Sequence, residues 1–233
     1  MVFYYITLAI LLVAYALIAI FVLDRLKNTK ITNLIFCLVA VVCYLGVVII
    51  ALIQNGWSDW NFLNTLPTAN VSPFMFFVCP IYLLLPKKPK DYFLNLIVLL
   101  SIGMIVSPIF GIVYNIYRDY AFHGQFVLDY AAHVSLSLWG LYIVKSHQIE
   151  LNVKDSLISG SLIVGVALTM LIINLIFDTS FFGLSLRGKH NIYNVVLVEN
   201  SFLSCLIYFG GLLAILLVGY LFNRYLVYKK KDA

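Results

Sequence analysis

Residues 127–144 read VLDYAAHVSLSLWGLYIV and place two ionisable groups, Asp129 and His133, inside an otherwise apolar run. A helix needs about 20 apolar residues to cross ~30 Å of hydrocarbon, so this run is typical of a membrane span. Residues four positions apart share a helix face, which puts Asp129, His133 and Ser137 on one polar stripe. Because ionisable groups are expensive inside a bilayer and usually face a protein interior or a wet cavity, the stripe predicts a functional site.

The rest of the chain is equally apolar. Of its 233 residues, 63% are hydrophobic and 11% charged, and the mean hydropathy of +1.01 excludes a water-soluble domain with a polar shell. No hydrophilic stretch is long enough to bury its own core, so residues 1–233 are predicted to form a single integral membrane domain. We predict an all-α, polytopic transmembrane bundle of about seven spans, with six as the alternative. The candidate spans are residues 3–23, 32–53, 69–85, 92–114, 127–144, 156–177 and 202–223.

Basic residues predict the orientation of the bundle. If the loops alternate between the two sides of the membrane, twelve of the 15 Lys and Arg residues fall on one side. By the positive-inside rule the N-terminus is then outside and the C-terminus cytoplasmic, in a multi-pass protein of the plasma membrane. The basic tail, residues 228–232, is interpreted first as a topology determinant and second as a contact for anionic lipid, so membrane lipids are the expected partners and nucleic acid is not. Aromatic residues predicted near the outer interface are Trp57, Trp60, Tyr114, Tyr117 and Tyr120.

Further polar residues fall at the outer ends of the predicted spans, whereas the cytoplasmic halves are mostly apolar. The residues of this outer layer that we expect to line a polar cavity are Asn70, Ser72, Ser107, Ser137, Asn174 and Asp178. Ser72 and Ser107 each precede a proline, and a proline inside a helix removes a backbone donor and kinks the helix. The alternative is that the polar residues only join helices through hydrogen bonds worth about 0.6 kcal/mol each.

Motifs for cofactors and metals are missing from the sequence. The four cysteines are scattered through apolar runs without C-x-x-C spacing or a neighbouring histidine, so a metal site is not expected. There is no P-loop, dinucleotide-binding fingerprint, H-E-x-x-H or EF-hand sequence. We therefore predict no cofactor and no metal.

The order of several motifs resembles a known family. Leu66-Pro67 is followed by Asn70-Val71-Ser72, by Ser107-Pro108, by His133 and by the segment 174–182. This order is similar to that of the YwaF-like bacterial integral membrane proteins, which are related to eukaryotic membrane acyltransferases. The resemblance covers roughly residues 60–223. It implies a histidine at the position of His133 that is paired, in the acyltransferase relatives, with a cysteine of the third helix.

The third-helix motif departs from the family pattern Leu-Pro-x-His-x-Cys. Asn70 and Ser72 stand near the places of the histidine and the cysteine, with the spacing one residue longer, and Cys79 lies two turns further on. A serine nucleophile needs a base, because its hydroxyl is a weak nucleophile at neutral pH. His133, oriented by Asp129, supplies the groups of a Ser-His-Asp arrangement with Ser72 as the leading nucleophile.

Three classes of function are consistent with this pattern. The first is a lipid acyltransferase or acyl-ester hydrolase that uses His133 and Ser72. The second is a transporter or ligand-binding membrane protein in which Asp129 and His133 hold a proton or a polar ligand. The third is a non-catalytic accessory protein. The sequence does not identify a substrate, an oligomeric state or a protein partner.

Overall fold

The computed structural model of the chain describes residues 2–58, 60–63, 65–113, 123–184, 186 and 200–231. These residues fold almost entirely into helices and contain no strand. Six of the helices are long and apolar enough to cross a membrane, which confirms the predicted polytopic bundle. They are α1 (Val2–Leu17, prolonged by the helical turns η1, Ile18–Val22, and η2, Leu23–Arg25), α2 (Thr29–Asn55), α5 (Lys87–Val113), α6 (His123–Lys145), α7 (Val153–Phe177) and α9 (Ser201–Lys231).

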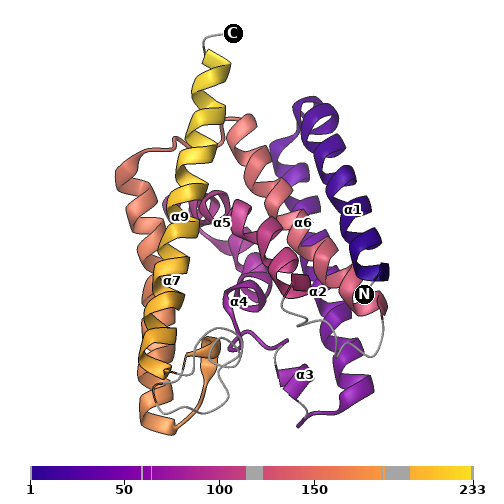
Figure 1. The fold of residues 1–233 in the computed structure, drawn as a ribbon. Helices are drawn as coiled ribbons and strands as arrows, with labels where there is room; N and C mark the ends of the chain where they lie inside the picture. Colours follow the sequence, from indigo (N-terminus) through magenta and orange to yellow (C-terminus); the bar gives the residue numbers. More distant parts are fainter. Residues whose placement is uncertain are drawn as a thin grey trace.

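Helix α6, which carries the polar stripe, lies at the centre of the bundle (Figure 1). It packs against α1, α2, α5 and α9, and the side chains of Tyr130, Trp139 and Tyr142 are fully buried. The peripheral helices instead present large apolar side chains such as Ile53 and Phe177 to the outside. Apolar outer faces of this kind are typical of a surface that contacts hydrocarbon. Because the peripheral helices present these faces, they separate α6 from the surrounding lipid.

The third predicted span, residues 69–85, is the only one of the seven without a long helix. It consists of α4 (Val71–Val78) and the 3-10 helix η3 (Cys79–Leu84), preceded by the four-residue helix α3 (Trp60–Leu63). Pro73 occupies the first turn of α4, where the missing N–H would have no helical partner. Pro80 falls at the change from α-helix to 3-10 helix, because its ring prevents the regular i to i−4 bond.

Hydrogen bonds show that α4 starts well inside the bundle. The Tyr44 hydroxyl, in the middle of α2, donates to the Thr65 carbonyl at 3.2 Å. The Tyr44 ring also stacks on Phe76 of α4 at 4.3 Å. The chain that leaves α2 at Asn55 therefore turns back along α2 before α4 begins. Backbone that is not helical is tolerated at membrane depth only where protein or water satisfies its polar groups.

The other end of this segment reaches the opposite end of the bundle. Tyr82 of η3 accepts a hydrogen bond from Asn33, in the first turns of α2, at 3.0 Å. Asn33 in turn bonds Gln148 in the loop between α6 and α7. This end of the molecule also carries the α1–α2 connection and the C-terminal end of α9 (Figure 1). Residues 65–84 thus run from the middle of α2, at Tyr44, to its first turns, at Asn33.

Several residues named in the sequence interpretation lie outside the described part of the chain. They are Tyr114, Tyr117 and Tyr120, predicted near the outer interface, and the three basic residues that the alternation of loops puts on the outer side, Arg118, Arg187 and Lys189.

Candidate functional site

The predicted pair of ionisable residues is buried and in contact. Asp129 and His133 expose only 6% and 4% of their surface, and Nδ1 of His133 lies 3.4 Å from Oδ1 of Asp129. The same nitrogen is 2.8 Å from the backbone carbonyl oxygen of Asp129. A carbonyl only accepts hydrogen bonds, so Nδ1 carries the hydrogen and Nε2 of the neutral ring holds the lone pair. His133 is therefore oriented to accept a proton through Nε2.

Phe76 of α4 lies against the His133 ring. The two rings meet edge to face, with centroids 5.1 Å apart and planes at 78°. Phe76 is itself buried and also stacks on Tyr44. The imidazole thus sits between its own aspartate and an aromatic side chain of the broken helix.

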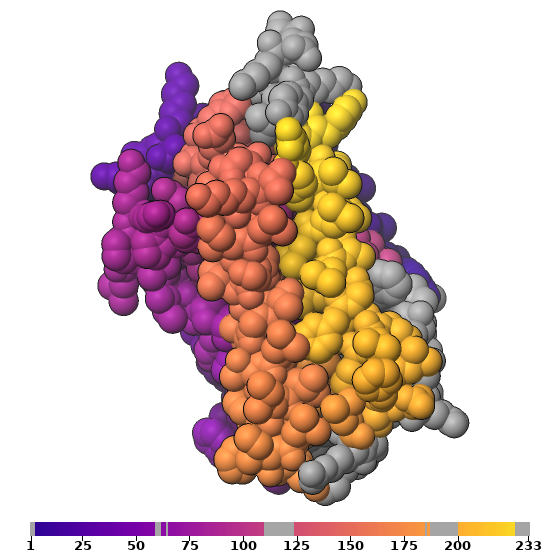
Figure 2. All heavy atoms as spheres, turned by 90° about the vertical axis from the view of Figure 1, so that its left-hand side faces the viewer, coloured from indigo at the N-terminus to yellow at the C-terminus, as the bar shows by residue number. Residues whose placement is uncertain are grey.

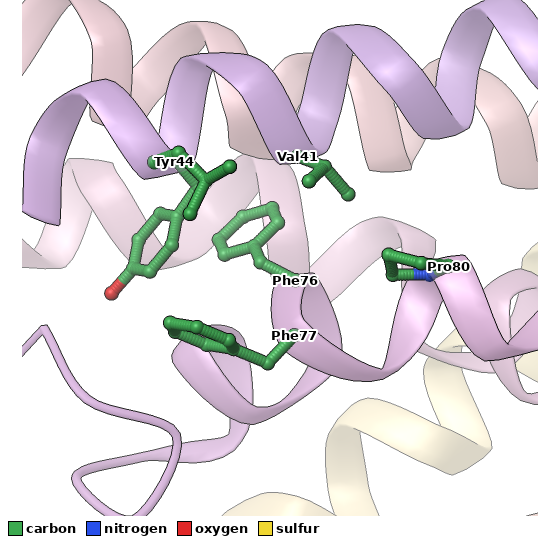
Figure 3. Close-up of a pocket in the computed structure, with 6 residues that line it drawn as sticks. Val41, Tyr44, Phe76, Phe77 and Pro80 are labelled. Atoms are coloured by element: carbon green, nitrogen blue, oxygen red, sulfur yellow. The ribbon is translucent and has the colours of Figure 1, made fainter.

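Phe76 also lines a groove between α2 and the α4–η3 segment (Figure 3). The groove has a volume of about 210 Å³ and is lined by Val41, Tyr44, Leu45, Phe76, Phe77 and Pro80. Phe77 and Pro80 are exposed at its edge. We call it the α2–α4 groove. Its lining is apolar apart from the Tyr44 hydroxyl, in contrast to the polar cavity expected from the sequence.

A second groove lies on the opposite side of the same short helix. It has a volume of about 190 Å³ and is lined by Phe74, Val78 and Ile81 of α4–η3 together with apolar residues of α5 and α7. Helix α7 runs along the outer face of the bundle beside α9 (Figure 2). The broken helix thus has an apolar groove on each side.

None of the predicted serines forms a hydrogen bond with His133 in the described part of the chain. Ser72 is half-buried on α4, one turn before Phe76, and the described residues include no hydrogen bond between Ser72 and His133. Ser137 is fully buried, but its hydroxyl donates to Tyr15 of α1 at 3.2 Å. Ser107 is exposed on α5. Cys79 is buried within η3. The stripe on α6 therefore divides, with His133 facing α4 and Ser137 facing α1.

Asn174 and Asp178 form the end of α7. Asn174 is 3% exposed, and its amide bonds the chain that follows the helix, at Thr179, Phe181 and Leu184. Asp178 is the C-terminal cap of α7 in the left-handed conformation, and its N–H donates to the Asn174 carbonyl. Asn70 is the N-cap of α4, where its side chain accepts the N–H of Val71 at 2.8 Å. In these bonds Asn70, Asn174 and Asp178 organise the ends of helices.

A second polar cluster has no counterpart in the sequence interpretation. It lies at the end of the bundle that carries Arg25, Lys88 and Lys145, which we call the basic end. Its centre is Asn33, which is 3% exposed. Trp139 donates from Nε1 to Asn33 Oδ1 at 3.0 Å, and Asn33 donates to Tyr82 and to Gln148 at 3.0 and 2.6 Å. The ammonium of Lys90 lies 4.9 Å from the centre of the Tyr82 ring. The position of Asn33 in the first turns of a long apolar helix could have indicated a buried polar cluster. Its partners could not be predicted, because they lie between 49 and 115 residues away in the sequence.

Metal ligands do not cluster in the described part of the chain, where no group of three His, Cys, Asp or Glu side chains could hold an ion. No protein-family model, curated protein or solved structure matches this chain.

Proposed function

We propose that this integral membrane protein binds a lipid, or another amphiphile with an acyl chain, beside its broken third helix. The observation that supports this proposal is the double role of Phe76, which lines the apolar α2–α4 groove and also contacts His133. A hydrocarbon chain in the groove would lie one aromatic ring away from the Asp129–His133 pair. We further propose that the protein resides in the plasma membrane and that the ligand enters from the outer leaflet.

The chemistry of the groove fits a hydrocarbon ligand. Its lining is made of aliphatic and aromatic side chains, and Phe77 and Pro80 at its edge are exposed within the apolar zone of the bundle. Ligand sites are commonly apolar clefts with a few precisely placed polar groups that fix the orientation of the ligand. The Tyr44 hydroxyl belongs to the lining itself, and Phe76 connects the groove to the Asp129–His133 pair, so these polar groups would lie nearest to the ester or headgroup region.

The catalytic form of the proposal is acyl transfer, as the YwaF-like resemblance implies. Nε2 of His133 would take the proton of a nucleophilic hydroxyl while that oxygen attacks the ester carbonyl, and the alcohol of the ester would leave with a proton. Ser72 is the candidate nucleophile, because it lies one turn from Phe76 on α4. The Asp129 carbonyl, as the acceptor for Nδ1–H, would hold the imidazole in the required tautomer.

Photochemical labelling tests the binding proposal. The purified protein in nanodiscs is irradiated with a phosphatidylcholine that carries a diazirine in its acyl chain, and the labelled peptides are mapped by mass spectrometry. We expect labelling concentrated on residues 41–45 and 76–80. Val41→Trp, which fills the groove, should lower this labelling several-fold.

The matched control is Val42→Trp, one residue further along α2. Val42 is 63% exposed on the outer face of the helix, so its replacement leaves the groove open and the labelling unchanged. Equal labelling of all lipid-facing helices, or an equal effect of the two tryptophans, would show that the groove binds no lipid chain selectively.

A further inference from the structure

The chain after α7 folds back against the bundle and is fastened by one buried side chain. Asn174 donates from Nδ2 to the carbonyls of Phe181 and Leu184 at 2.8 and 2.5 Å. Its Oδ1 accepts from the Thr179 hydroxyl and from the Phe181 N–H, both at 2.7 Å. Both donors and the acceptor of the amide are therefore used within residues 179–184, which we call the strap.

The backbone of the strap has a conformation that needs support. Phe182 has φ of +58°, and Asp178, just before the strap, has φ of +55°. Non-glycine residues rarely adopt positive φ, and such conformations persist only where surrounding contacts determine them. The four hydrogen bonds of Asn174 provide these contacts, so we expect the strap to depend on this residue.

The strap is attached to the chain that leads into α4. The Phe182 N–H donates to the Thr68 carbonyl at 2.7 Å, two residues before the N-cap of α4. The Phe182 side chain is completely buried, and its ring lies edge to face against Phe74 of α4 at 5.9 Å. Two irregular segments, before α4 and after α7, thus satisfy each other's backbone polar groups beside the start of α4.

We infer that the strap holds α4 in position, with Asn174 as its anchor and Phe182 as its contact with α4. Helix α4 has only eight residues and a groove on each side, so lateral packing supports it less than it supports the long helices. Because Phe74 and Phe76 belong to this short helix, Asn174 is a positioning residue for the contact between Phe76 and His133. The consequence for ligand binding rests on the proposed function.

Hydrogen–deuterium exchange tests the inference. In nanodiscs, Asn174→Ala should raise amide exchange in α4, residues 71–78, at least tenfold and leave exchange in α2 and α6 unchanged. Asn174→Asp keeps the acceptor for Phe181 and Thr179, so it should restore part of the protection. Phe182→Gly, which accepts the positive φ but removes the ring, should reproduce the effect of Asn174→Ala with the anchor intact.

The matched control is Asn33→Ala, which removes an equally buried asparagine from the basic end. It should raise exchange around Tyr82 and Gln148 and spare residues 71–78. Unchanged exchange in α4 of Asn174→Ala, or an equal increase in all helices, would overturn the inference. Faster exchange in α4 of Asn174→Ala, together with no selective diazirine labelling of the groove in the unsubstituted protein, would support the strap and count against the proposed function instead.

Discussion

At the scale of single residues, the chemistry available to His133 follows from the hydrogen bond on its other nitrogen. Nδ1 is engaged by the Asp129 carbonyl, which leaves Nε2 for any proton transfer. A general base must come within about 3 Å of the proton it removes, directly or through one water, although catalytic contacts are often longer without a substrate. Any nucleophile that His133 deprotonates must therefore approach Nε2, and Phe76 of α4 is an aromatic neighbour of this ring.

Ser72 supplies the first prediction. If the protein transfers acyl groups through Ser72, incubation with activated acyl esters or phospholipids should give a covalent acyl adduct on this residue, detected by peptide mass spectrometry. Ser72→Ala should abolish the adduct. His133→Ala should slow its formation about 10²- to 10⁴-fold, as expected for the loss of a general base.

Ser107→Ala is the control for this experiment, because Ser107 also precedes a proline but is exposed on α5. It should leave the adduct unchanged. If no adduct or hydrolysis occurs with any ester, and His133→Ala instead abolishes uptake of a solute into proteoliposomes, the protein is a transporter and the acyl-transfer hypothesis is wrong.

The residue types and their spacing predicted part of the candidate site. The i, i+4 spacing of Asp129 and His133 was enough to predict their contact, because both lie on one helix. Asn174 was expected to line a cavity, but its amide fastens the strap; that role depends on a chain reversal after Asp178 that no helical pattern indicates. Phe76 was missed, because one phenylalanine among many in an apolar run carries no signal of what it touches.

At the scale of elements, the long helices were easy to predict and the broken one was not. Runs of more than 20 apolar residues define α2, α5, α7 and α9, since each must satisfy its own backbone in lipid. The run at 69–85 has the same apolar composition, but it folds as α4 and η3. Its prolines indicated that the helix is broken. The sequence does not indicate how deep in the bundle α4 begins, because that position depends on the long-range hydrogen bond between Tyr44 and Thr65.

Packing of α9 against α5 gives the second prediction. A Cβ atom at Gly219 would lie 1.9 Å from the carbonyl oxygen of Leu99, a backbone atom that cannot move without shifting α5. One turn later the Asn223 amide donates to the Val98 carbonyl at 3.1 Å. Small residues allow such close approach of helices in membranes. Gly219→Ala should therefore lower the free energy of unfolding by about 1–3 kcal/mol, measured by denaturation in mixed micelles.

Gly211→Ala is the matched variant on the same helix. A Cβ atom at this position meets nothing within 4 Å, so alanine should be neutral or slightly stabilising because it is the better helix former. Similar stabilities of the two variants would show that α5 and α9 do not pack as closely as described.

At the scale of the whole molecule, the Lys and Arg residues that the structure describes gather at one end of the bundle, and the other end differs in kind of structure. The basic end carries Arg25, Lys88 and Lys145, and Lys145 there donates to the Ala19 carbonyl and pairs with Asp24 at 3.3 Å. The opposite end holds the irregular segments that meet around Thr68 and Phe182. This asymmetry is what a bundle with one cytoplasmic and one external face requires, and it places the strap on the external side if the positive-inside rule holds.

Labelling of single cysteines decides that orientation. Ser58 and Lys88 are both exposed, in connections at opposite ends of the bundle. In intact cells, a cysteine at Ser58 should react with a membrane-impermeant maleimide, and a cysteine at Lys88 should react only after the cells are permeabilised. The native cysteines 37, 79 and 205 are buried, and Cys43 is half-buried, so the unsubstituted protein gives the background. Labelling of Lys88→Cys alone would reverse the orientation, and would move the strap and the start of α4 to the cytoplasmic side, where an outer-leaflet ligand could not enter.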